Sequence, residues 1–351
     1  MRLLIITQKM DRKDPVLGFF HRWVEEFSKR LRRVTVVCLQ KGECDLPGNV
    51  AVLSLGKEKW KSTAKYVFLL FYFSLRYANR YDAVLVHMNQ EYILAAGWLW
   101  RLLGKRVYMW RNHYAGSFLT DVSSVFCTKI FCTSHYSYTA RFKKTRFMPV
   151  GVDTEFFKPD PKVAQVPRSI LSLGRIAPSK NLHTFIAALG ILKKAGTGTG
   201  TGAPTSFTGD VYGNPLPADQ AYAQGLKKQL ADAGLSGQVK FMPGVPNRET
   251  PAVYSAHQIF VNLSPNGMYD KTIFEAMACG CFVFASNDDL RDKNDPAFAF
   301  AYNDPTDLAA KISGFISLPE GEQKKKAEKI SGLVRDHSLS RLADELIKEI
   351  R

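Results

Sequence analysis

The sequence contains no long apolar run. The longest candidate, Tyr66–Leu75, holds ten residues, whereas a helix that spans a bilayer needs about 18 or more. The six cysteines form no CxxC pair, so we expect reduced, buried thiols and no structural zinc. No repeat with a period of roughly 20–50 residues is visible. The chain is therefore not expected to be a transmembrane protein, a disulfide scaffold or a solenoid.

The composition is that of a soluble globular protein, with 46% hydrophobic and 23% charged residues. A length of 351 residues corresponds to two domains at about 100–200 residues each. The opening residues Met1–Thr7 carry one positive charge and a short apolar run, with no small-residue cleavage site behind them. We interpret them as a first buried strand and expect a cytoplasmic protein.

Acidic residues are scarce in the first half of the chain. Residues 1–157 hold 25 Lys and Arg against 12 Asp and Glu, a net charge of +13, whereas residues 158–351 hold 23 against 20, a net charge of +3. Such an asymmetry indicates a first half that meets an anionic partner, for which a membrane surface, an anionic glycan and nucleic acid are the alternatives. Lysines that only keep the surface soluble are the competing explanation.

Short apolar runs alternate with amphipathic stretches, which is typical of βα units in a parallel sheet. Strands are expected at 3–7, 34–39, 50–54, 83–87, 107–111, 129–133, 146–149, 169–173, 207–212, 239–242, 258–263 and 282–285. Helices are expected at 16–31, 61–79, 93–103, 182–193, 218–233, 250–256, 272–278, 305–316 and 339–350, with a short one from 136. The pattern predicts an α/β protein with two doubly wound, Rossmann-like domains.

A proline-rich segment separates the two halves. Thr154–Arg168 contains three prolines among charged residues, as domain linkers often do. We therefore expect a domain at 1–157, a second at 158–335 and a C-terminal helix at 336–351. The tract Gly196–Gly202, GTGTGTG, follows a helix and matches neither GxxxxGK(S/T) nor GxGxxG, so we interpret it as a flexible connector.

In open parallel sheets, ligands bind at the carboxyl ends of strands, where helix N-termini present free N–H groups. Gly18 lies in the loop before the first helix, where glycine permits a close backbone approach. A plain turn glycine is the alternative. His113 follows the strand Val107–Arg111 and has no second histidine spaced to share a metal with it. It is either a site residue or a structural histidine.

Two later loops carry charged groups that suit a phosphate. Gly174–Asn181 sets Arg175 and Lys180 five residues apart between a strand and a helix, so a guanidinium and an ammonium can hold a diphosphate together. Ser264–Gly280 contains a glycine-bearing loop ahead of a helix, and Glu275 lies one turn into that helix. A carboxylate there can accept hydrogen bonds from sugar hydroxyls, and the apolar residues after it favour its burial at a cleft.

Four stretches together resemble the GT-B glycosyltransferases of the family 4 type, which transfer a sugar from a nucleotide sugar. They are Gly18 with the helix that follows and Val34–Cys38; Met148–Asp153 with Phe157 and Pro159, similar to PNGVD…F.P; Gly174–Lys180, similar to GRL…KG; and Phe274–Gly280 with Val283, similar to EAMACG.PVV. The resemblance covers nearly the whole chain. It implies two Rossmann-like doubly wound domains facing a cleft, the first binding the acceptor and the second the donor, with the C-terminal helix packing back toward the first. The loop at Gly18 would bind acceptor or phosphate.

The resemblance also implies roles for single residues. Arg175 and Lys180 would hold the donor diphosphate and help to stabilise the leaving group. Glu275 would bind the donor ribose, and Gly213 would lie near the nucleotide. His113 would be aimed at the donor sugar and take part in catalysis. No metal or other cofactor is implied, because cationic side chains and a helix dipole stabilise the diphosphate.

One position departs from the family pattern. The family has two glutamates separated by seven residues, but the position eight before Glu275 is Gly267, so the first carboxylate, which touches the transferred sugar, is missing. Asp270 in the same loop is expected to take over this catalytic role, and Lys271 and Thr272 are expected to donate to phosphate. Retention of the anomeric configuration is usual in the family and is expected here.

We therefore expect a glycosyltransferase that moves a hexosyl unit from a nucleotide-diphosphate sugar to a glycan or lipid-linked acceptor in cell-envelope or polysaccharide biosynthesis. The segment Lys57–Arg80 is rich in aromatic and basic residues and would lie in an anionic membrane interface, which makes the protein peripheral at the inner face of the membrane. A buried core helix with basic ends is the alternative for this segment.

Three other functions stay open. A nucleotide-sugar epimerase of the same fold would release free nucleotide without an acceptor. A nucleic-acid-binding module would use the basic charge, but no helix-turn-helix, zinc or RNA-binding signature is present, so no nucleic-acid partner is expected. An inactive glycosyltransferase-like scaffold is compatible with the missing glutamate.

Overall fold

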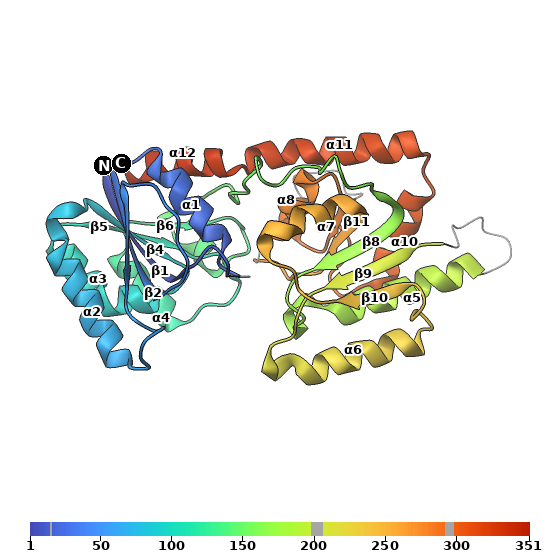
Figure 1. The fold of residues 1–351 in the computed structure, drawn as a ribbon, viewed down its shortest axis with the longest axis horizontal. Coiled ribbons are helices and arrows are strands. Elements are labelled where there is room, and N and C mark those ends of the chain that lie inside the picture. The colour runs from blue at the N-terminus through green and yellow to red at the C-terminus, as the bar shows by residue number, and fades with distance from the viewer. Residues whose placement is uncertain (15, 198–205, 268, 292–297) are drawn as a thin grey trace. The chain divides into compact units, whose positions relative to one another are not determined.

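Two parallel β-sheets organise the protein (Figure 1). The computed structural model describes residues 1–351 apart from residue 15 and residues 198–205, 268 and 292–297. Contacts divide the chain into a first unit, Met1–Gly151 with Ser338–Arg351, and a second unit, Val152–His337. Each unit contains one of the sheets, and each is described by itself.

Within the described residues, the first unit holds a seven-stranded sheet in the order β3-β2-β1-β4-β5-β6-β7. Its strands are β1 (Arg2–Met10), β2 (Arg33–Lys41), β3 (Val50–Ser54), β4 (Ala83–His87), β5 (Arg106–Trp110), β6 (Lys129–Cys132) and β7 (Thr145–Phe147). Its helices are α1 (Phe19–Ser28), α2 (Thr63–Arg76), α3 (Glu91–Leu102), α4 (Phe118–Phe126) and α12 (Leu339–Ile350), with the 3₁₀ turns η1 (Ala78–Arg80) and η2 (Tyr138–Arg141).

The inner strand β1 explains why this sheet is covered on both faces. Leu3 and Ile5 belong to a core cluster with side chains of α1 and α12, whereas Leu4 and Ile6 belong to a second cluster with side chains of α2 and α3. Successive side chains of a strand point to opposite faces, so a continuous apolar run requires helices on each side. Ile5 pairs with Val36 on one neighbour and with Leu85 on the other.

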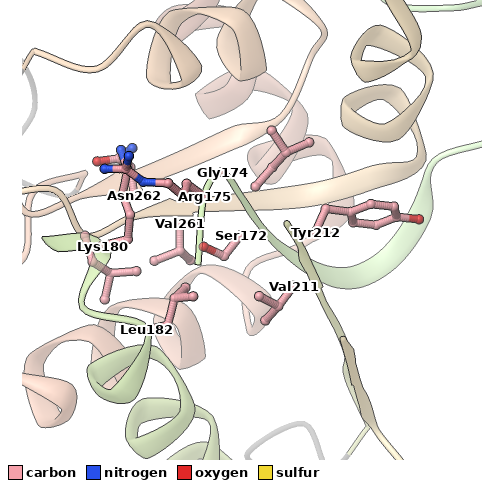
Figure 2. A pocket seen from close by; sticks show the side chains of 11 residues that line it. Ser172, Gly174, Arg175, Lys180, Leu182, Val211, Tyr212, Val261 and Asn262 are labelled. Atoms are coloured by element: carbon pink, nitrogen blue, oxygen red, sulfur yellow. The ribbon is translucent and has the colours of Figure 1, made fainter. Parts of the chain in front are cut away.

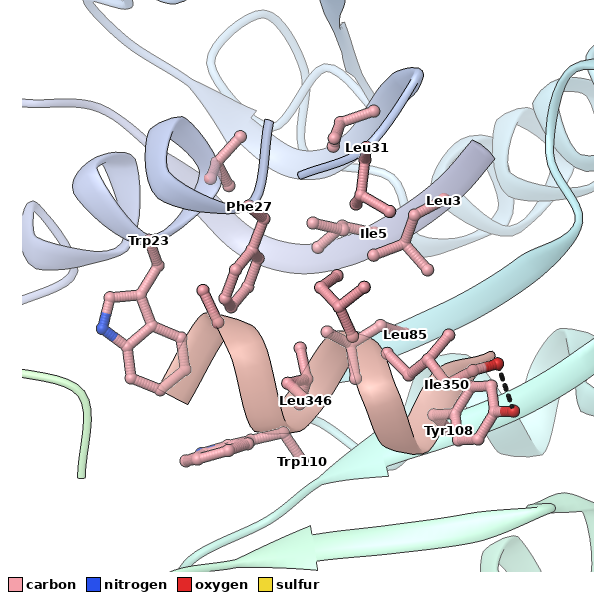
Figure 3. Close-up of a cluster of buried hydrophobic side chains, with 14 of the residues drawn as sticks. Leu3, Ile5, Trp23, Phe27, Leu31, Leu85, Tyr108, Trp110, Leu346 and Ile350 are labelled. Atoms are coloured by element: carbon pink, nitrogen blue, oxygen red, sulfur yellow. Dashed lines mark hydrogen bonds between the residues drawn. The ribbon is translucent and has the colours of Figure 1, made fainter. Parts of the chain in front are cut away.

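The C-terminal helix α12 belongs to the first unit. Leu342, Leu346 and Ile350 are fully buried in a cluster with side chains from α1 and the sheet. Figure 3 shows Leu346 and Ile350 in this cluster. The Tyr108 hydroxyl donates a hydrogen bond of 3.0 Å to the Ile350 carbonyl. Arg30, which follows α1, forms an ion pair of 2.6 Å with Asp344. A chain segment far from the first unit in sequence thus completes its core.

Within the described residues, the second unit holds a five-stranded sheet in the order β10-β9-β8-β11-β12. Its strands are β8 (Val166–Leu173), β9 (Thr208–Tyr212), β10 (Val239–Met242), β11 (His257–Asn262) and β12 (Phe282–Ala285). Its helices are α5 (Leu182–Thr197), α6 (Gln220–Asp232), α7 (Thr250–Ala256), α8 (Lys271–Ala278), α9 (Asp288–Arg291), α10 (Pro305–Ile316) and α11 (Glu320–Asp336), with the 3₁₀ turns η3 (Pro178–Lys180), η4 (Pro217–Asp219) and η5 (Asn247–Glu249).

The strand order of the second unit reverses beside β8. The chain runs from β8 outward through β9 and β10 and then crosses to β11 on the other side of β8. The loops after β8 and β11 therefore diverge, and the crevice at such a reversal is where doubly wound sheets bind ligands. Phe282 stacks on Phe315 with ring centroids 3.9 Å apart, which anchors α10 to the edge strand β12.

The predicted fold class, two doubly wound α/β domains, is confirmed. The structure divides the chain after Gly151, earlier than the expected boundary at 157/158, because the linker packs with the second unit. The backbone N–H of Val152 donates to the carbonyl of His337 at 2.9 Å, and the ring of Phe157 contacts that of Tyr254 at 6.4 Å.

Within the described residues, three helices were not predicted from the sequence: α4, the short α9 and α11. In the tract Gly196–Gly202, expected to be a connector, the first two residues end α5 and the others lie outside the described residues. None of the helices in the described part of the chain is both long and apolar enough to cross a membrane.

Candidate functional site

A small hollow lies at the carboxyl ends of β8, β9 and β11 in the second unit (Figure 2). Its lining comes from the ends of these strands and from the loop after β8. The lining residues are Ser172, Leu173, Gly174, Arg175, Lys180, Leu182, Val211, Tyr212, Val261, Asn262 and Leu263. This is the ligand-binding edge expected for an open parallel sheet, and it contains both Arg175 and Lys180 of the predicted site.

Two glycines let the loops after β8 and β9 approach each other. The Gly174 N–H donates to the Tyr212 carbonyl at 3.0 Å. A Cβ atom on Gly213 would lie 1.9 Å from the Gly174 carbonyl oxygen, and Gly174 has a φ of +153°. Only glycine fits such a contact and such a backbone angle without strain. The absence of a side chain at Gly213 thus allows the loop after β9 to pack against the backbone of Gly174.

The loop after β8 presents Arg175 and Lys180 in different ways. Arg175 is exposed, and among the described residues it has no ion-pair partner. Lys180 ends the turn η3 and is half-buried. Asn181 then adopts a left-handed φ of 47°, and its side-chain amide donates to the Leu263 carbonyl at 3.3 Å. This bond ties the loop to the end of β11.

Lys180 forms an ion pair with Asp270, the N-cap residue of α8. The Lys180 ammonium also donates to Ser264 Oγ at 3.1 Å. Asp270 Oδ2 accepts from Asn262 Nδ2 at 3.3 Å and from Ser264 Oγ at 3.2 Å, while Oδ1 accepts from the Thr272 N–H at 3.2 Å. The structure thus joins three predicted site residues, Lys180, Asp270 and Thr272, in one polar cluster.

This cluster keeps Asp270 ionised. Burial alone would raise the pKa of its carboxyl, but the charge of Lys180 and the hydrogen bonds from Lys180, Thr272 and Asn262 lower that pKa to about 2. Asn262 and Ser264 were not among the predicted site residues. Their position directly at the end of the buried strand β11 is the sequence signal by which they could have been found.

Glu275 lies on the second turn of α8 and is 6% exposed. The Tyr254 hydroxyl donates to Glu275 Oε2 at 3.3 Å. Burial, followed by the charge of Glu275, raises the pKa of Tyr254 well above its usual range, so this hydroxyl keeps its proton. The predicted burial of Glu275 is confirmed. Lys271, which opens α8, is half-buried.

Gly267, where the family resemblance leads one to expect a glutamate, has a φ of +80°. This is the left-handed region, in which a glutamate would be strained. The backbone of this loop at Gly267 thus favours glycine over glutamate.

His113 lies in the first unit, just after β5. Its Nδ1 accepts a hydrogen bond of 2.9 Å from the Ala115 N–H, and its ring stacks on Tyr114 at 4.5 Å. Burial lowers the pKa of His113 from its usual value, and the charge of Arg111 lowers it further. The ring is therefore neutral at pH 7, and with Nδ1 accepting, its proton resides on Nε2.

Gly18 precedes α1 and is explained by packing. A Cβ atom there would lie 2.5 Å from the Asp14 carbonyl oxygen. The Asp14 carboxylate holds this turn, because it accepts from the N–H groups of Val16 and Leu17 at 2.9 and 2.7 Å and pairs with Lys9 at 2.6 Å. The expected role of this loop in binding acceptor or phosphate stays a prediction.

Arg111, at the end of β5, was not predicted as a site residue. Its guanidinium is half-buried and donates to the Ala115 carbonyl at 3.0 Å, while Nε is buried and has no hydrogen-bond partner among the described residues. Burial lowers its pKa from the ordinary value. Among the same residues, no group of three or more His, Cys, Asp or Glu side chains is placed to hold a metal ion.

A family model described as glycosyl transferases group 1 matches residues 153–331. Among curated proteins, the chain is 26% identical over 178 residues to the GDP-mannose-dependent alpha-(1-6)-phosphatidylinositol monomannoside mannosyltransferase of Mycolicibacterium smegmatis. It is 30% identical over 145 residues to the D-inositol 3-phosphate glycosyltransferase of Frankia alni. The matches span 42% and 39% of this chain, and 43% and 34% of those proteins. The similarity thus covers less than half of each relative.

The whole chain also resembles solved structures. The Anabaena protein HepE, crystallised in complex with UDP, superposes with a TM-score of 0.77 at 17% identity, and the match covers 99% of both chains. At this identity the likeness shows a shared fold over the full length. It supports the GT-B arrangement of two α/β domains that the sequence predicted.

Proposed function

Because the chain belongs to the group 1 glycosyl transferases, we propose that it transfers a hexosyl unit from a nucleotide-diphosphate sugar to a glycan or lipid-linked acceptor. One observation supports this proposal most strongly. Arg175 and Lys180 line the same hollow at the carboxyl edge of the second sheet, and Lys180 pairs with Asp270 at the start of α8. A helix N-terminus and two cations in one place suit a diphosphate. Both relatives described above are named as glycosyltransferases.

In this proposal, Arg175 and Lys180 hold the diphosphate. Arg175 is exposed and can clamp two phosphate oxygens, whereas Lys180 adds a point charge from deeper in the loop. Lys271 and Thr272 open α8 and supply further donors. When the bond between the sugar and the phosphate breaks, negative charge grows on the departing diphosphate, and these groups stabilise it. Cationic side chains and the helix N-terminus do this without a metal ion.

The other predicted residues fit around this centre. Glu275 binds the ribose hydroxyls of the donor, and Gly213 lies near the nucleotide, in the loop that packs against Gly174. His113 donates a hydrogen bond from its Nε2–H group to a hydroxyl of the donor sugar. The contact of Asp270 with the transferred sugar stays a prediction. The Asp270 carboxylate already accepts hydrogen bonds from Lys180 and Asn262, so the sugar would have to share this carboxylate with them. Retention of configuration is part of the proposal.

We further propose that the acceptor is met at an anionic membrane surface on the cytoplasmic side, in cell-envelope or polysaccharide biosynthesis. The first half of the chain carries a net charge of +13. The helix α2 has exposed apolar side chains, with Phe68 67% exposed. Basic charge with exposed aromatic side chains favours reversible attachment to anionic lipid. The mycobacterial relative is named for a phosphatidylinositol-based acceptor.

A thermal-shift screen tests the donor site. The purified chain is mixed with UDP, GDP, ADP and their common sugar conjugates, including GDP-mannose, with magnesium or with EDTA. A ligand at about 100 times its Kd adds about 2.7 kcal/mol of stability. We expect a raised midpoint with one nucleotide, equal in both buffers. Arg175→Ala and Glu275→Ala should each lose this shift, and Lys240→Ala, which removes an exposed charge of the same unit, should keep it.

The same screen can contradict the proposal. If no nucleotide shifts the midpoint of a well-folded sample, the donor site is refuted and an inactive scaffold or a nucleic-acid-binding protein is favoured. Once a donor binds, nucleotide release is measured with and without acceptor. Release that needs no acceptor would indicate an epimerase instead of a transferase.

A further inference from the structure

A second pocket lies in the first unit and contains none of the residues assigned above. Its volume is about 590 Å³, and it lies between α2 and α3, which stand side by side in Figure 1. Its lining includes Leu39 near the end of β2 and Leu55 just after β3. The pocket is therefore at the carboxyl edge of the larger sheet, where such sheets bind their ligands.

The inner lining of this pocket is apolar. Leu55 and Leu70 are 1% and 2% exposed, and the half-buried Tyr66, Val67 and Ala95 add further hydrocarbon surface from α2 and α3. A hydrocarbon chain that enters here exchanges water for apolar contacts. The lining thus selects for a ligand with an apolar part.

Two exposed lysines belong to the same lining. Lys57 and Lys61 have no ion-pair partner among the described residues. Glu58, the residue after Lys57, is not part of the lining, and its carboxylate accepts a hydrogen bond of 2.9 Å from Ser54 Oγ on β3. Glu91 is the one acidic residue of the lining, so the lining keeps a net positive charge. An anionic group beside the apolar chain complements this charge.

An exposed apolar surface adjoins these helices. Phe68, Tyr72 and Leu75 of α2 are 67%, 48% and 54% exposed and recur at the spacing of one helix face. Trp98 of α3 contacts Phe71 of α2 with ring centroids 5.9 Å apart, so the surface continues across both helices. Aromatic side chains of this kind are enriched where proteins meet lipid headgroups.

We infer that this pocket binds the hydrocarbon chain of a phosphate-bearing lipid, whose phosphate is held by Lys57 and Lys61. The inference rests on the proposed function, since it assigns the lipid part of the acceptor to a named site. Asn89 of the lining follows β4, and His113 follows β5, the next strand of the sheet. The bound lipid therefore shares one edge of the sheet with the histidine expected at the donor sugar.

Calorimetric titration of the full chain with decyl phosphate, below its micelle-forming concentration, tests this site. Ala95→Phe places a ring among the α3 side chains of the lining, and Lys57→Gln with Lys61→Gln removes both charges. Lys59→Gln with Lys65→Gln removes two charges from the same segment outside the lining and is the matched control. We expect about tenfold weaker binding or more in the first two variants and no change of that order in the control.

Several results would overturn the inference. Unchanged binding to the Ala95→Phe variant, or an equal loss in the control variant, would place the lipid elsewhere. Inorganic phosphate that binds as tightly as decyl phosphate would refute the hydrocarbon part, and decyl glucoside that binds as tightly would refute the phosphate part. If the Ala95→Phe variant fails to fold, the lysine pair and its control decide, because their side chains are exposed.

Nucleotides titrated into the same samples separate this inference from the proposed function. Nucleotide binding without lipid binding would refute the pocket alone. Lipid binding without nucleotide binding would refute the donor site and leave the pocket standing.

Discussion

At the scale of single residues, the pairing of Lys180 with Asp270 sets the state of the candidate phosphate site before any donor arrives. The ammonium of Lys180 is already matched by one carboxylate and one hydroxyl. A diphosphate must therefore compete with Asp270 for this lysine, whereas Arg175 is exposed and ready to bind. We interpret Asp270 as the residue that positions Lys180 and caps α8 at once.

The pH dependence of stability tests this pairing. The pKa of Asp270 is about 2 in the folded chain against an ordinary 3.8, so its ionised form stabilises the fold. This stabilisation is complete above about pH 5 and is lost as the pH falls through 4 toward 2; at 1.36 kcal/mol for each pKa unit it amounts to about 2 kcal/mol. Urea unfolding of wild type and Asp270→Asn should therefore differ most near neutral pH, with a gap that narrows by about this amount toward pH 2.

Asp304→Asn is the matched control for this experiment. Asp304 caps α10 by accepting from the Thr306 N–H at 2.9 Å and the Asp307 N–H at 3.0 Å, and among the described residues it has no cationic partner. The control separates loss of a cap from loss of the ion pair. A gap between wild type and Asp270→Asn that stays constant from pH 7 to pH 2 would contradict the pairing.

The sequence predicted the kinds of residue in this site better than their contacts. Arg175, Lys180 and Glu275 could be chosen because loops after strands and helix N-termini are recognisable from local pattern. The bond between Lys180 and Asp270 joins loops 90 residues apart, and no local pattern encodes such a contact. The left-handed φ of Gly267 likewise cannot be read from the local sequence pattern.

At the scale of elements, the helix α12 was predicted from its apolar stripe, whereas α11 was missed. The α12 residues Leu342, Leu346 and Ile350 recur at four-residue spacing, which fixed both the helix and its buried face. In α11, only Gln323, Ile330 and Val334 are buried along 17 residues. Its long charged stretch shows too little periodicity to be read from the sequence.

Truncation in α12 tests how far this helix supports the first unit. Leu346 is fully buried, and Leu346→Ala should destabilise the first unit by about 2–5 kcal/mol through a cavity in its core. Lys348→Ala, on the exposed face of the same helix, should change stability by less than about 0.5 kcal/mol. Urea unfolding checks both variants, and nucleotide binding should be kept in each. Similar midpoints for the two variants would show that α12 is dispensable for the core.

At the scale of the whole molecule, the unequal charge of the two halves of the chain predicts a different kind of partner for each half. The net charge of +13 falls on residues 1–157 and only +3 on the rest, while the candidate donor site lies in the second unit. A few cationic side chains at fixed positions are enough to bind a nucleotide sugar. An excess of positive charge spread over a whole domain instead attracts an extended anionic surface. In the proposed function, we therefore assign the asymmetry to the acceptor side of the reaction and the affinity for the donor to Arg175 and Lys180.

Vesicle binding at varied salt tests this division. Sedimentation with vesicles that contain anionic lipid should carry down most of the chain at low salt, because each basic residue near the surface adds about 1 kcal/mol. Raising the salt to about 0.5 M should release most of it, since charges are then screened within a few ångströms. Neutral vesicles are the control for purely apolar attachment, and a DNA duplex is the control for a general affinity for polyanions. Equal sedimentation with neutral vesicles would assign the attachment to the exposed aromatic side chains of α2 alone, and tighter binding to the duplex than to the vesicles would favour the nucleic-acid alternative.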